Sequence, residues 1–286
     1  MADTSRTLLD TLARCGVARV ADGDPRPAFA LATSQDGVTV GAYPGDEFEQ
    51  RLDPMVSCLM VTSGERFSIS LALECYRRQL HKRREIVIVT YLDRVAGLRK
   101  LVDANGVGNA SVHGVGRDLT LGEMRNVAVG RSRGDILIQW DDDDLYDPAR
   151  ISAAVALLTR SNAAATLLWR LLIWCPEREL AAISVGRPWE GSMAVWRAHA
   201  PVHPSLNRME DSHAVEFLAS TRALALCSVP YLYVYVAHGR NTCDAQHFET
   251  HLAHAARVMR GKPYRKLIEG LALRMPILEY RAGLGL

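Results

Sequence analysis

The sequence predicts an α/β protein in which a mainly parallel sheet is followed by a mixed β half. Short apolar runs alternate with helical repeats from about residue 54, and such alternation is typical of βαβ units with right-handed crossovers. After about residue 161, strand-like segments follow one another with one helix among them. A chain of 286 residues, 48% of them hydrophobic, can bury the core of one large domain.

The first half is predicted to consist of alternating strands and helices. Its strands are short and rich in valine and isoleucine, as strands buried on both faces of a parallel sheet are. The first helix places Ile69, Leu73 and Tyr76 on one face. The third begins with a capping box, Thr120 and Glu123. The predicted order is strand 56–61, helix 68–79, strand 85–90, helix 95–102, strand 110–115, helix 121–131 and strand 135–140.

The second half is predicted to be mixed, because turn residues such as Pro176 and Gly186 separate its strand-like segments. Its predicted order is strand 167–175, strand 180–185, strand 192–196, helix 212–221, strand 223–229 and strand 231–237. We expect the domain to span residues 54–245. Residues 1–53 are expected to form an N-terminal extension with a helix at 6–14 and a hairpin around 34–37, and residues 246–286 a C-terminal helical segment.

Four consecutive aspartates follow the strand predicted at 135–140, and Asp147-Pro148 behind them is a typical helix start. The four carboxylates therefore lie at the carboxyl end of a strand, where open α/β sheets bind ligands. Crowded carboxylates repel one another and need a cation or much water. Mg²⁺ or Mn²⁺ takes such oxygen ligands together with phosphate oxygens. The alternative is a solvated acidic turn, although a helix cap needs only one aspartate.

The stretch around the aspartates resembles the donor-binding core of family 2 glycosyltransferases of the GT-A fold. Those enzymes carry Leu-Gly-x-x-Arg-Asn, then Ala-x-Gly-(Glu/Asp) opening a strand, then an Asp-x-Asp-Asp cluster and a proline-started helix. The matching residues here are Leu121, Gly122, Arg125, Asn126, Gly134, Asp135, Asp141, Asp143 and Asp144. The resemblance, over about residues 56–242, implies a GT-A type α/β domain that uses a nucleotide-diphosphate sugar and Mg²⁺ or Mn²⁺ in an inverting transfer.

The resemblance also implies roles for single residues. Asp143 would bind the metal directly, Asp141 would contact the ribose or a metal-bound water, and Asp142 and Asp144 would assist or orient them. The metal would neutralise the departing diphosphate. Arg125 and Asn126, in the first turns of their helix, would face the sugar nucleotide.

Two later segments carry further candidates. Glu210-Asp211 resembles the acidic pair that holds the family's catalytic base, which takes the proton of the acceptor hydroxyl. The alternative for Asp211 is an N-cap of the helix at 212–221. The segment 238–242 resembles the family's late His-x-x-Asn segment. His238 would complete the metal sphere or meet a phosphate, and Arg240 would clamp the diphosphate.

The loops after the first two strands depart from the family pattern. The family's Pro-Thr is Val61-Thr62 here, which leaves Thr62 as a donor contact. In the family, an acidic loop after the second strand reads the nucleotide base, and the corresponding residues here are Thr90-Tyr-Leu-Asp93. Asp93 would substitute there, so the base stays open, although a UDP-sugar is the expected donor.

A separate set of histidines shares one helix face but lacks the residue order of zinc peptidases. We interpret it as a solvated or nucleotide-side face: His247, His251 and His254.

The net charge, the apolar stretches and the cysteines limit the classes of partner and the cell compartment that we expect. A net charge of +2 gives no indication of a nucleic-acid partner. The N-terminus lacks the apolar core of a signal peptide, Arg170 breaks the longest apolar stretch, and the 6 scattered cysteines without a CxxC pair are typical of reduced thiols. We expect a cytoplasmic protein. The basic, partly apolar stretch 257–274 would suit either peripheral contact with the inner membrane face or packing on the domain.

The sequence thus predicts a glycosyltransferase, of the kind used in polysaccharide biosynthesis, that moves a hexosyl or hexosaminyl unit to a glycan, lipid-linked or other hydroxyl acceptor. Two alternatives remain. A nucleotidyltransferase would need a glycine-rich, basic loop after the first strand, whereas residues 61–66 hold only Gly64 and Arg66 of those types. A catalytically silent sugar-nucleotide-binding protein is suggested by the altered loop at 90–93. The sequence predicts no oligomeric state.

Overall fold

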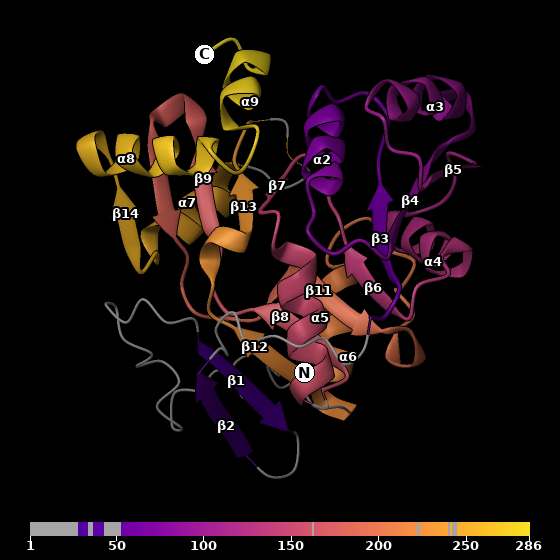
Figure 1. Ribbon diagram of the computed structural model, residues 1–286, viewed down its shortest axis with the longest axis horizontal. Coiled ribbons are helices and arrows are strands. Elements are labelled where there is room, and N and C mark those ends of the chain that lie inside the picture. Colours follow the sequence, from indigo (N-terminus) through magenta and orange to yellow (C-terminus); the bar gives the residue numbers. More distant parts are fainter. Residues whose placement is uncertain are drawn as a thin grey trace.

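The computed structural model describes residues 28–33, 37–42, 53–161, 163–221, 224–239, 241 and 245–286. Within these residues the chain forms two sheets flanked by helices (Figure 1). The elements of the first half are β3 (Val56–Val61), α2 (Ser68–Arg77), β4 (Arg84–Tyr91), α3 (Val95–Ala104), β5 (Ala110–Val115), α4 (Leu121–Arg131), β6 (Ile136–Gln139), β7 (Leu145–Tyr146) and α5 (Arg150–Ser161).

The second half contains shorter strands and the C-terminal helices. Two strands of the N-terminal region, β1 (Ala28–Thr33) and β2 (Gly37–Ala42), precede β3. The remaining elements are β8 (Ala165–Leu168), β9 (Leu172–Cys175), β10 (Leu180–Ile183), β11 (Trp189–Trp196), α6 (Glu210–Thr221), β12 (Leu224–Cys227), β13 (Tyr233–Val236), α7 (Ala245–Ala253), β14 (Arg257–Met259), α8 (Gly261–Ala272) and α9 (Ile277–Gly283).

The large sheet has the strand order β2-β1-β12-β8-β11-β6-β3-β4-β5. Strands β6, β3, β4 and β5 run parallel, with Cys58 of β3 opposite both Ile86 and Ile138. Side chains alternate between the two faces of a strand. Cys58 and Met60 therefore belong to the core beneath α2 and α3, whereas Leu59 and Val61 pack with Met124 of α4 on the other face.

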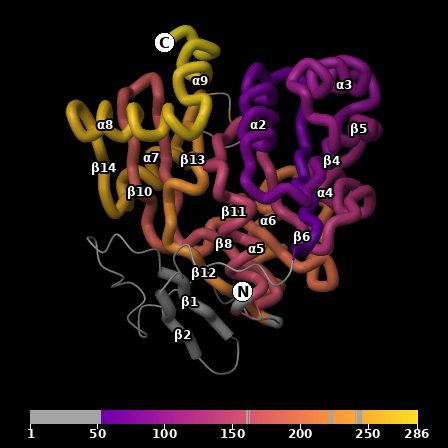
Figure 2. The backbone as a smooth tube through the Cα atoms, viewed as in Figure 1, coloured from indigo at the N-terminus to yellow at the C-terminus, as the bar shows by residue number. Residues whose placement is uncertain are grey.

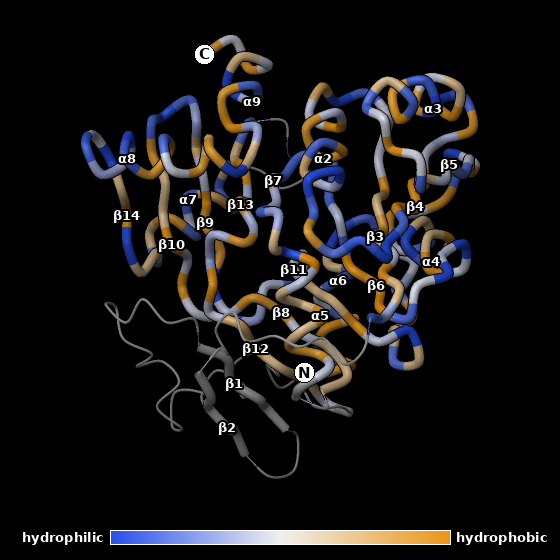
Figure 3. Tube along the Cα trace, viewed as in Figure 1, coloured by the Kyte–Doolittle hydropathy of each residue, from blue (hydrophilic) through white to orange (hydrophobic). Residues whose placement is uncertain are grey.

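Strand β11 turns the parallel sheet into a mixed one, because it pairs antiparallel with β6 on one side and β8 on the other. Beyond it β12 pairs parallel with β8, and the β1–β2 hairpin continues the sheet antiparallel. The helix expected at 6–14 lies outside the described residues. In hydropathy the strands β6 and β8 of the large sheet are mostly apolar, while α3 and α8 mix apolar and polar residues (Figure 3), as surface helices do.

The second sheet has the order β14-β10-β9-β13-β7, with α8 and α9 beside it (Figures 1 and 2). Helix α9 also contacts α2, so the C-terminal segment touches both halves. Among the described residues no helix is long and apolar enough to cross a bilayer.

Three predicted elements differ from the structure. The strand expected at 167–175 is two strands, β8 and β9, in different sheets. Both are fully buried, and an apolar run without alternation does not show where a chain changes sheet. The segment expected to be helical after 246 contains β14, which pairs with the edge of β10. Helix α5 begins at Arg150, after the short strand β7, rather than at Pro148.

Candidate active site at the carboxyl edge of the parallel strands

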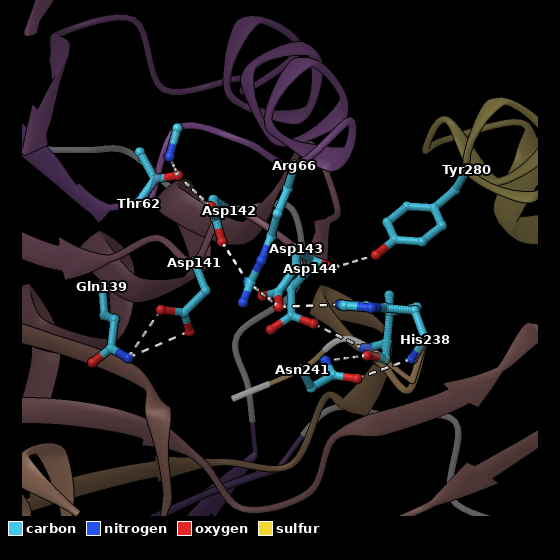
Figure 4. A network of polar contacts seen from close by, with 12 residues as sticks. Thr62, Arg66, Gln139, Asp141, Asp142, Asp143, Asp144, His238, Asn241 and Tyr280 are labelled. Carbon is cyan, nitrogen blue, oxygen red and sulfur yellow. Dashed lines mark hydrogen bonds and ion pairs between the residues drawn. The ribbon is translucent and has the colours of Figure 1, made fainter. Parts of the chain in front are cut away.

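The carboxyl ends of β3 and β6 bring Thr62 and the aspartate run together, and the chain returns after β13 to place His238 beside them (Figure 4). These residues are separated by about 80 to 95 positions in the sequence. The parallel sheet makes them neighbours because successive strands end at one edge. The structure thus gathers the predicted metal and donor residues of three loops.

Each aspartate has its own set of partners. Asp141 accepts from the Tyr233 hydroxyl at 3.1 Å and lies 3.6 Å from the Arg125 guanidinium. Asp142 accepts from the Thr62 hydroxyl. Asp144 is held by the backbone N–H of Val236 at 2.8 Å and by the same tyrosine at 2.5 Å.

Asp143 differs from these three because its carboxylate meets two cation-forming side chains. The Arg66 guanidinium lies 2.5 Å from Oδ2, and His238 Nε2 lies 3.2 Å from the same oxygen. The backbone of His238 is fixed by Asn241, whose side-chain oxygen accepts its N–H at 3.0 Å and whose amide donates to Val236 O at 2.8 Å. The His-x-x-Asn spacing thus forms a closed turn that holds the imidazole on Asp143.

The buried carboxylates of the cluster repel one another when they are ionised. Burial and the charge of Asp143 raise the pKa of Asp142 to about 6. Burial, and again Asp143, hold the pKa of Asp144 well above its usual range. Burial also raises the pKa of Asp141, against the opposing effect of Arg125. These shifts mean that the ionised cluster gains from any additional cation.

A divalent metal fits this donor set. Within the described ranges no three His, Cys, Asp or Glu side chains form a ready metal cage. Mg²⁺ and Mn²⁺ do not need one, because they bind through one or two carboxylates and complete their shell with water and phosphate oxygens. Asp143 and His238 offer one carboxylate and one imidazole at the same place.

The C-terminal segment reaches the same loop at two points. The Tyr280 hydroxyl of α9 donates to the backbone oxygen of Asp143 at 2.7 Å, and its ring is fully buried against Phe67 and Trp174. Arg274, just after α8, forms an ion pair with Asp147 and donates to its Oδ1 at 2.8 Å. A tyrosine in a C-terminal helix carries no spacing signal, so the sequence did not indicate these contacts.

The acidic pair lies on the other side of Asp141. Glu210 is 2% exposed and accepts from Arg125 Nε at 2.9 Å, so one arginine links Glu210 to Asp141. Helix α6 begins at Glu210 itself. Asp211 therefore lies in the first helical turn, and the N-cap alternative is wrong. Met209, directly before the pair, has φ +64°, a left-handed conformation that is uncommon for such a residue and is often found near functional sites.

A tight loop explains the glycine of the Leu-Gly-x-x-Arg-Asn stretch. A Cβ on Gly122 would lie 1.9 Å from the backbone oxygen of Pro204, and Gly122 N donates to Leu206 O at 2.9 Å. The Asn126 side chain exchanges two hydrogen bonds with the backbone of His203, at 2.8 and 2.9 Å. Asn126 thus holds the 201–206 loop rather than facing the aspartates.

Asp93, like Asn126, is a predicted donor residue that the structure does not bring to the cluster. Asp93 has its side chain 53% exposed and pairs with Arg117 at 2.7 Å. Arg240 lies outside the described residues. Glu190 is partly buried near the acidic pair, 2.7 Å from Arg187 and 3.5 Å from the Ser212 hydroxyl. Burial raises the pKa of Glu190, with Arg187 opposing it and Asp211 adding to it.

The histidine face of α7 packs against aromatic rings. The rings of His247 and His251 lie 4.4 Å apart, His251 lies 4.8 Å from Trp189, and the Tyr235 hydroxyl lies 3.3 Å from His247 Nε2. Burial and the neighbouring His247 lower the pKa of His251 to about 4. Part of the face expected to be solvated is therefore packed on the second half.

The sequence matches no family model and no curated protein sequence. Solved structures do match the fold. The S. aureus TarS 1–349 complex with UDP-GlcNAc is 14% identical, with a TM-score of 0.51 over 77% of this chain and 66% of that one. The mannosyltransferase PcManGT from Pyrobaculum calidifontis, in complex with GDP-Man and Mn²⁺, is 16% identical, with a TM-score of 0.53 over 85% of this chain and 74% of that one.

This chain covers 42% of the longer S. aureus TarS structure. At such low identities the likeness concerns the fold. The chain has the mixed α/β architecture of GT-A glycosyltransferases, with a large sheet and C-terminal helices, and the predicted fold class is confirmed.

Proposed function

We propose that this protein is a metal-dependent glycosyltransferase that moves a hexosyl or hexosaminyl unit from a nucleotide-diphosphate sugar to a hydroxyl acceptor with inversion. The observation that carries the proposal is the junction of Asp143 and His238 at the carboxyl edge of the sheet, 3.2 Å apart, inside a cluster of buried carboxylates. In a GT-A fold this edge is suited to a diphosphate and its cation. The neighbours bound to UDP-GlcNAc and to GDP-Man with Mn²⁺ support the donor class and the metal.

Donor binding would involve both sides of the cluster. Asp143 and His238 would hold Mg²⁺ or Mn²⁺, which when bound supplies positive charge to the leaving diphosphate. Thr62 and Asp142 share a hydrogen bond at the end of β3 and would border the nucleoside. Asp141, fixed by Tyr233 and facing Arg125, would contact the ribose. The identity of the nucleotide base stays open, because Asp93 pairs with Arg117 and the two similar solved structures carry different nucleotides.

The two residues of the acidic pair would have different tasks. Glu210 is committed to Arg125 and would position that guanidinium beside the sugar. Asp211 is less buried, and its Oδ1 accepts the N–H of Ser212 at 2.8 Å. The N-terminal end of a helix favours an ionised carboxylate. Asp211 would therefore accept the proton of the acceptor hydroxyl as its oxygen attacks the anomeric carbon.

The proposal is tested by a thermal-shift screen of UDP- and GDP-sugars with and without Mn²⁺, followed by donor-turnover assays. Ligands that bind the native state raise its melting temperature. We expect one donor to give a shift that requires Mn²⁺, and slow release of its diphosphate in the presence of water or simple glycosides. A metal-dependent shift with a nucleoside triphosphate and a sugar phosphate instead would favour a nucleotidyltransferase. Donor binding without any turnover over a broad acceptor panel would favour the silent binding protein.

A further inference from the structure

Arg66 lies at the centre of the aspartate cluster, although no motif indicated it. It lies in the loop after β3, and its guanidinium reaches between two carboxylates, 2.9 Å from Asp142 Oδ1 and 2.5 Å from Asp143 Oδ2 (Figure 4). Its side chain is 27% exposed, whereas those of the two aspartates are 6% and 12% exposed. The guanidinium thus extends into the site from the side that is more exposed to solvent.

The contact with Asp143 occupies the oxygen best placed to bind a metal. Oδ2 of Asp143 is the atom that meets both the guanidinium and His238. A divalent cation bound to Oδ2 and the imidazole would repel a guanidinium at hydrogen-bond distance from the same atom. The two cations therefore compete for Asp143.

Only the side chain of Arg66 needs to move. Its backbone is fixed at the start of α2, where Ile69 N donates to Arg66 O at 3.4 Å. The preceding loop is held by the bond from Gly64 N to the Thr62 hydroxyl at 3.0 Å, and Gly64 supplies the left-handed φ of +82° that this turn requires. An arginine side chain rotating from a fixed base stays within the site and remains available to another anion.

We propose that Arg66 is a diphosphate-binding residue that the free protein holds on the metal-binding carboxylate: a divalent cation displaces it from Asp143, and it then pairs with the diphosphate of the donor. This inference rests on the proposed function and adds a coupling to it. The metal alone must break the Arg66–Asp143 pair, which lowers its apparent affinity. A diphosphate gives the displaced guanidinium a new, bidentate partner, so the metal and the nucleotide strengthen each other's binding.

The test is a titration of Mn²⁺ into the full chain, followed by the electron paramagnetic resonance signal of free Mn²⁺, first alone and then with saturating UDP or GDP. We expect Arg66→Gln to bind Mn²⁺ alone about tenfold more tightly than the wild type. The nucleotide should improve Mn²⁺ affinity in both proteins, because phosphate oxygens join the metal shell, but by a factor that is at least about fivefold larger in the wild type than in the variant. Arg178→Gln is the matched control, because Arg178 forms an exposed ion pair with Glu249 elsewhere, and it should behave as the wild type.

The Arg66→Lys variant separates the effect of the positive charge from that of the bidentate guanidinium geometry. Lysine keeps the cation but not the planar fork, so it should keep the weak affinity for Mn²⁺ alone and lose part of the gain with nucleotide. Equal Mn²⁺ affinities of wild type, Arg66→Gln and Arg66→Lys, with and without nucleotide, would overturn the role of Arg66 while leaving the metal site intact. Absence of Mn²⁺ binding in every variant and in the presence of nucleotide would overturn the metal site of the proposed function itself.

Discussion

At the scale of single residues, Asp143 is predicted to be the metal ligand whose loss is most selective. We expect Asp143→Asn to abolish the Mn²⁺-dependent thermal shift with nucleotide while the metal-free protein stays folded. Its melting temperature should not fall, because the charge of Asp143 raises the pKa of both Asp142 and Asp144. Asp103→Asn, an exposed change on α3, serves as the control. An unchanged Mn²⁺-dependent shift in Asp143→Asn would assign the metal to another residue.

The pKa of Asp142 predicts a pH dependence of the metal-free protein. Burial and Asp143 raise this pKa from 3.8 to about 6, so the folded state binds the proton more tightly than the unfolded state does. The contribution of this proton to the free energy of unfolding is fully present below pH 3.8, and it is lost as the pH rises towards about 6. In a chelating buffer the melting temperature should therefore fall over this window, and it should fall less in Asp142→Asn. Equal slopes in both proteins would contradict the assignment.

The role of Asp211 as the general base is tested by comparison with a second carboxylate on the same helix. We expect Asp211→Asn to lower kcat about a hundredfold or more with little change in the KM of the donor, which is the usual scale for a general base. Glu216→Gln is the matched control on the same helix, where Glu216 forms an exposed pair with His213, and it should leave kcat unchanged. A higher donor KM with an unchanged kcat in Asp211→Asn would assign Asp211 to donor binding.

The sequence predicted residues that belong to a motif and missed those that do not. Asp141, Asp143 and His238 were expected together because strand ends and family spacing place them at one edge, and the structure brings them together. Arg66 and Tyr280 are single residues in a loop and a helix, and their contacts depend on packing that no local pattern encodes. Asp93 was expected at the donor by its position after the second strand, but an arginine of another loop binds it instead.

At the scale of elements, alternation was a good guide to the parallel half and a poor one to the mixed half. Strands β3 and β5 and helix α4 have the predicted boundaries, because valine-rich runs and a capping box mark them. The run that became β8 and β9 is buried on both faces, so its change of sheet left no trace in the hydrophobic pattern. Strand β14 exists because the edge of β10 pairs with it, which is a tertiary cause.

Helix α9 is predicted to position the metal loop through Tyr280. Replacing this residue by phenylalanine removes the hydroxyl that donates to the backbone oxygen of Asp143 and leaves a buried carbonyl without that bond, at a cost of about 1–3 kcal/mol. We expect Tyr280→Phe to lower the Mn²⁺ affinity measured with nucleotide several-fold. The control is Tyr264→Phe, which removes a buried hydroxyl of α8 that accepts from Trp174 at 3.2 Å. Equal Mn²⁺ affinities of the two variants would make the role of Tyr280 purely structural.

At the scale of the whole molecule, the C-terminal segment is part of the core. Tyr264, Ile268 and Tyr280 belong to the same buried cluster as β3 and β9, and Arg274 pairs with Asp147 near the start of α5. Ending the chain before α7 would therefore expose this core. A membrane role of the segment has to be tested by changing charges on its surface and not by removing it.

The basic surface of α8 gives the last prediction. Its apolar side is buried against the protein, while Lys262, Arg265 and Lys266 are exposed. Because the apolar side is not available for insertion, contact with a membrane would be electrostatic, with roughly 1 kcal/mol per basic residue near an anionic surface. We expect the full chain to co-sediment with anionic vesicles at low salt and to be released as salt shortens the range of the attraction.

The matched variant reverses all three charges, with glutamate at positions 262, 265 and 266, and it should remain in the supernatant at low salt with an unchanged melting temperature. Neutral vesicles should retain neither protein. Binding that persists in high salt would mean that apolar groups insert, and the exposed side chains nearby, Leu273 and Leu278, would then be the residues to change. Equal sedimentation of both proteins, or of neither, would leave α8 as a packing element that covers the second sheet.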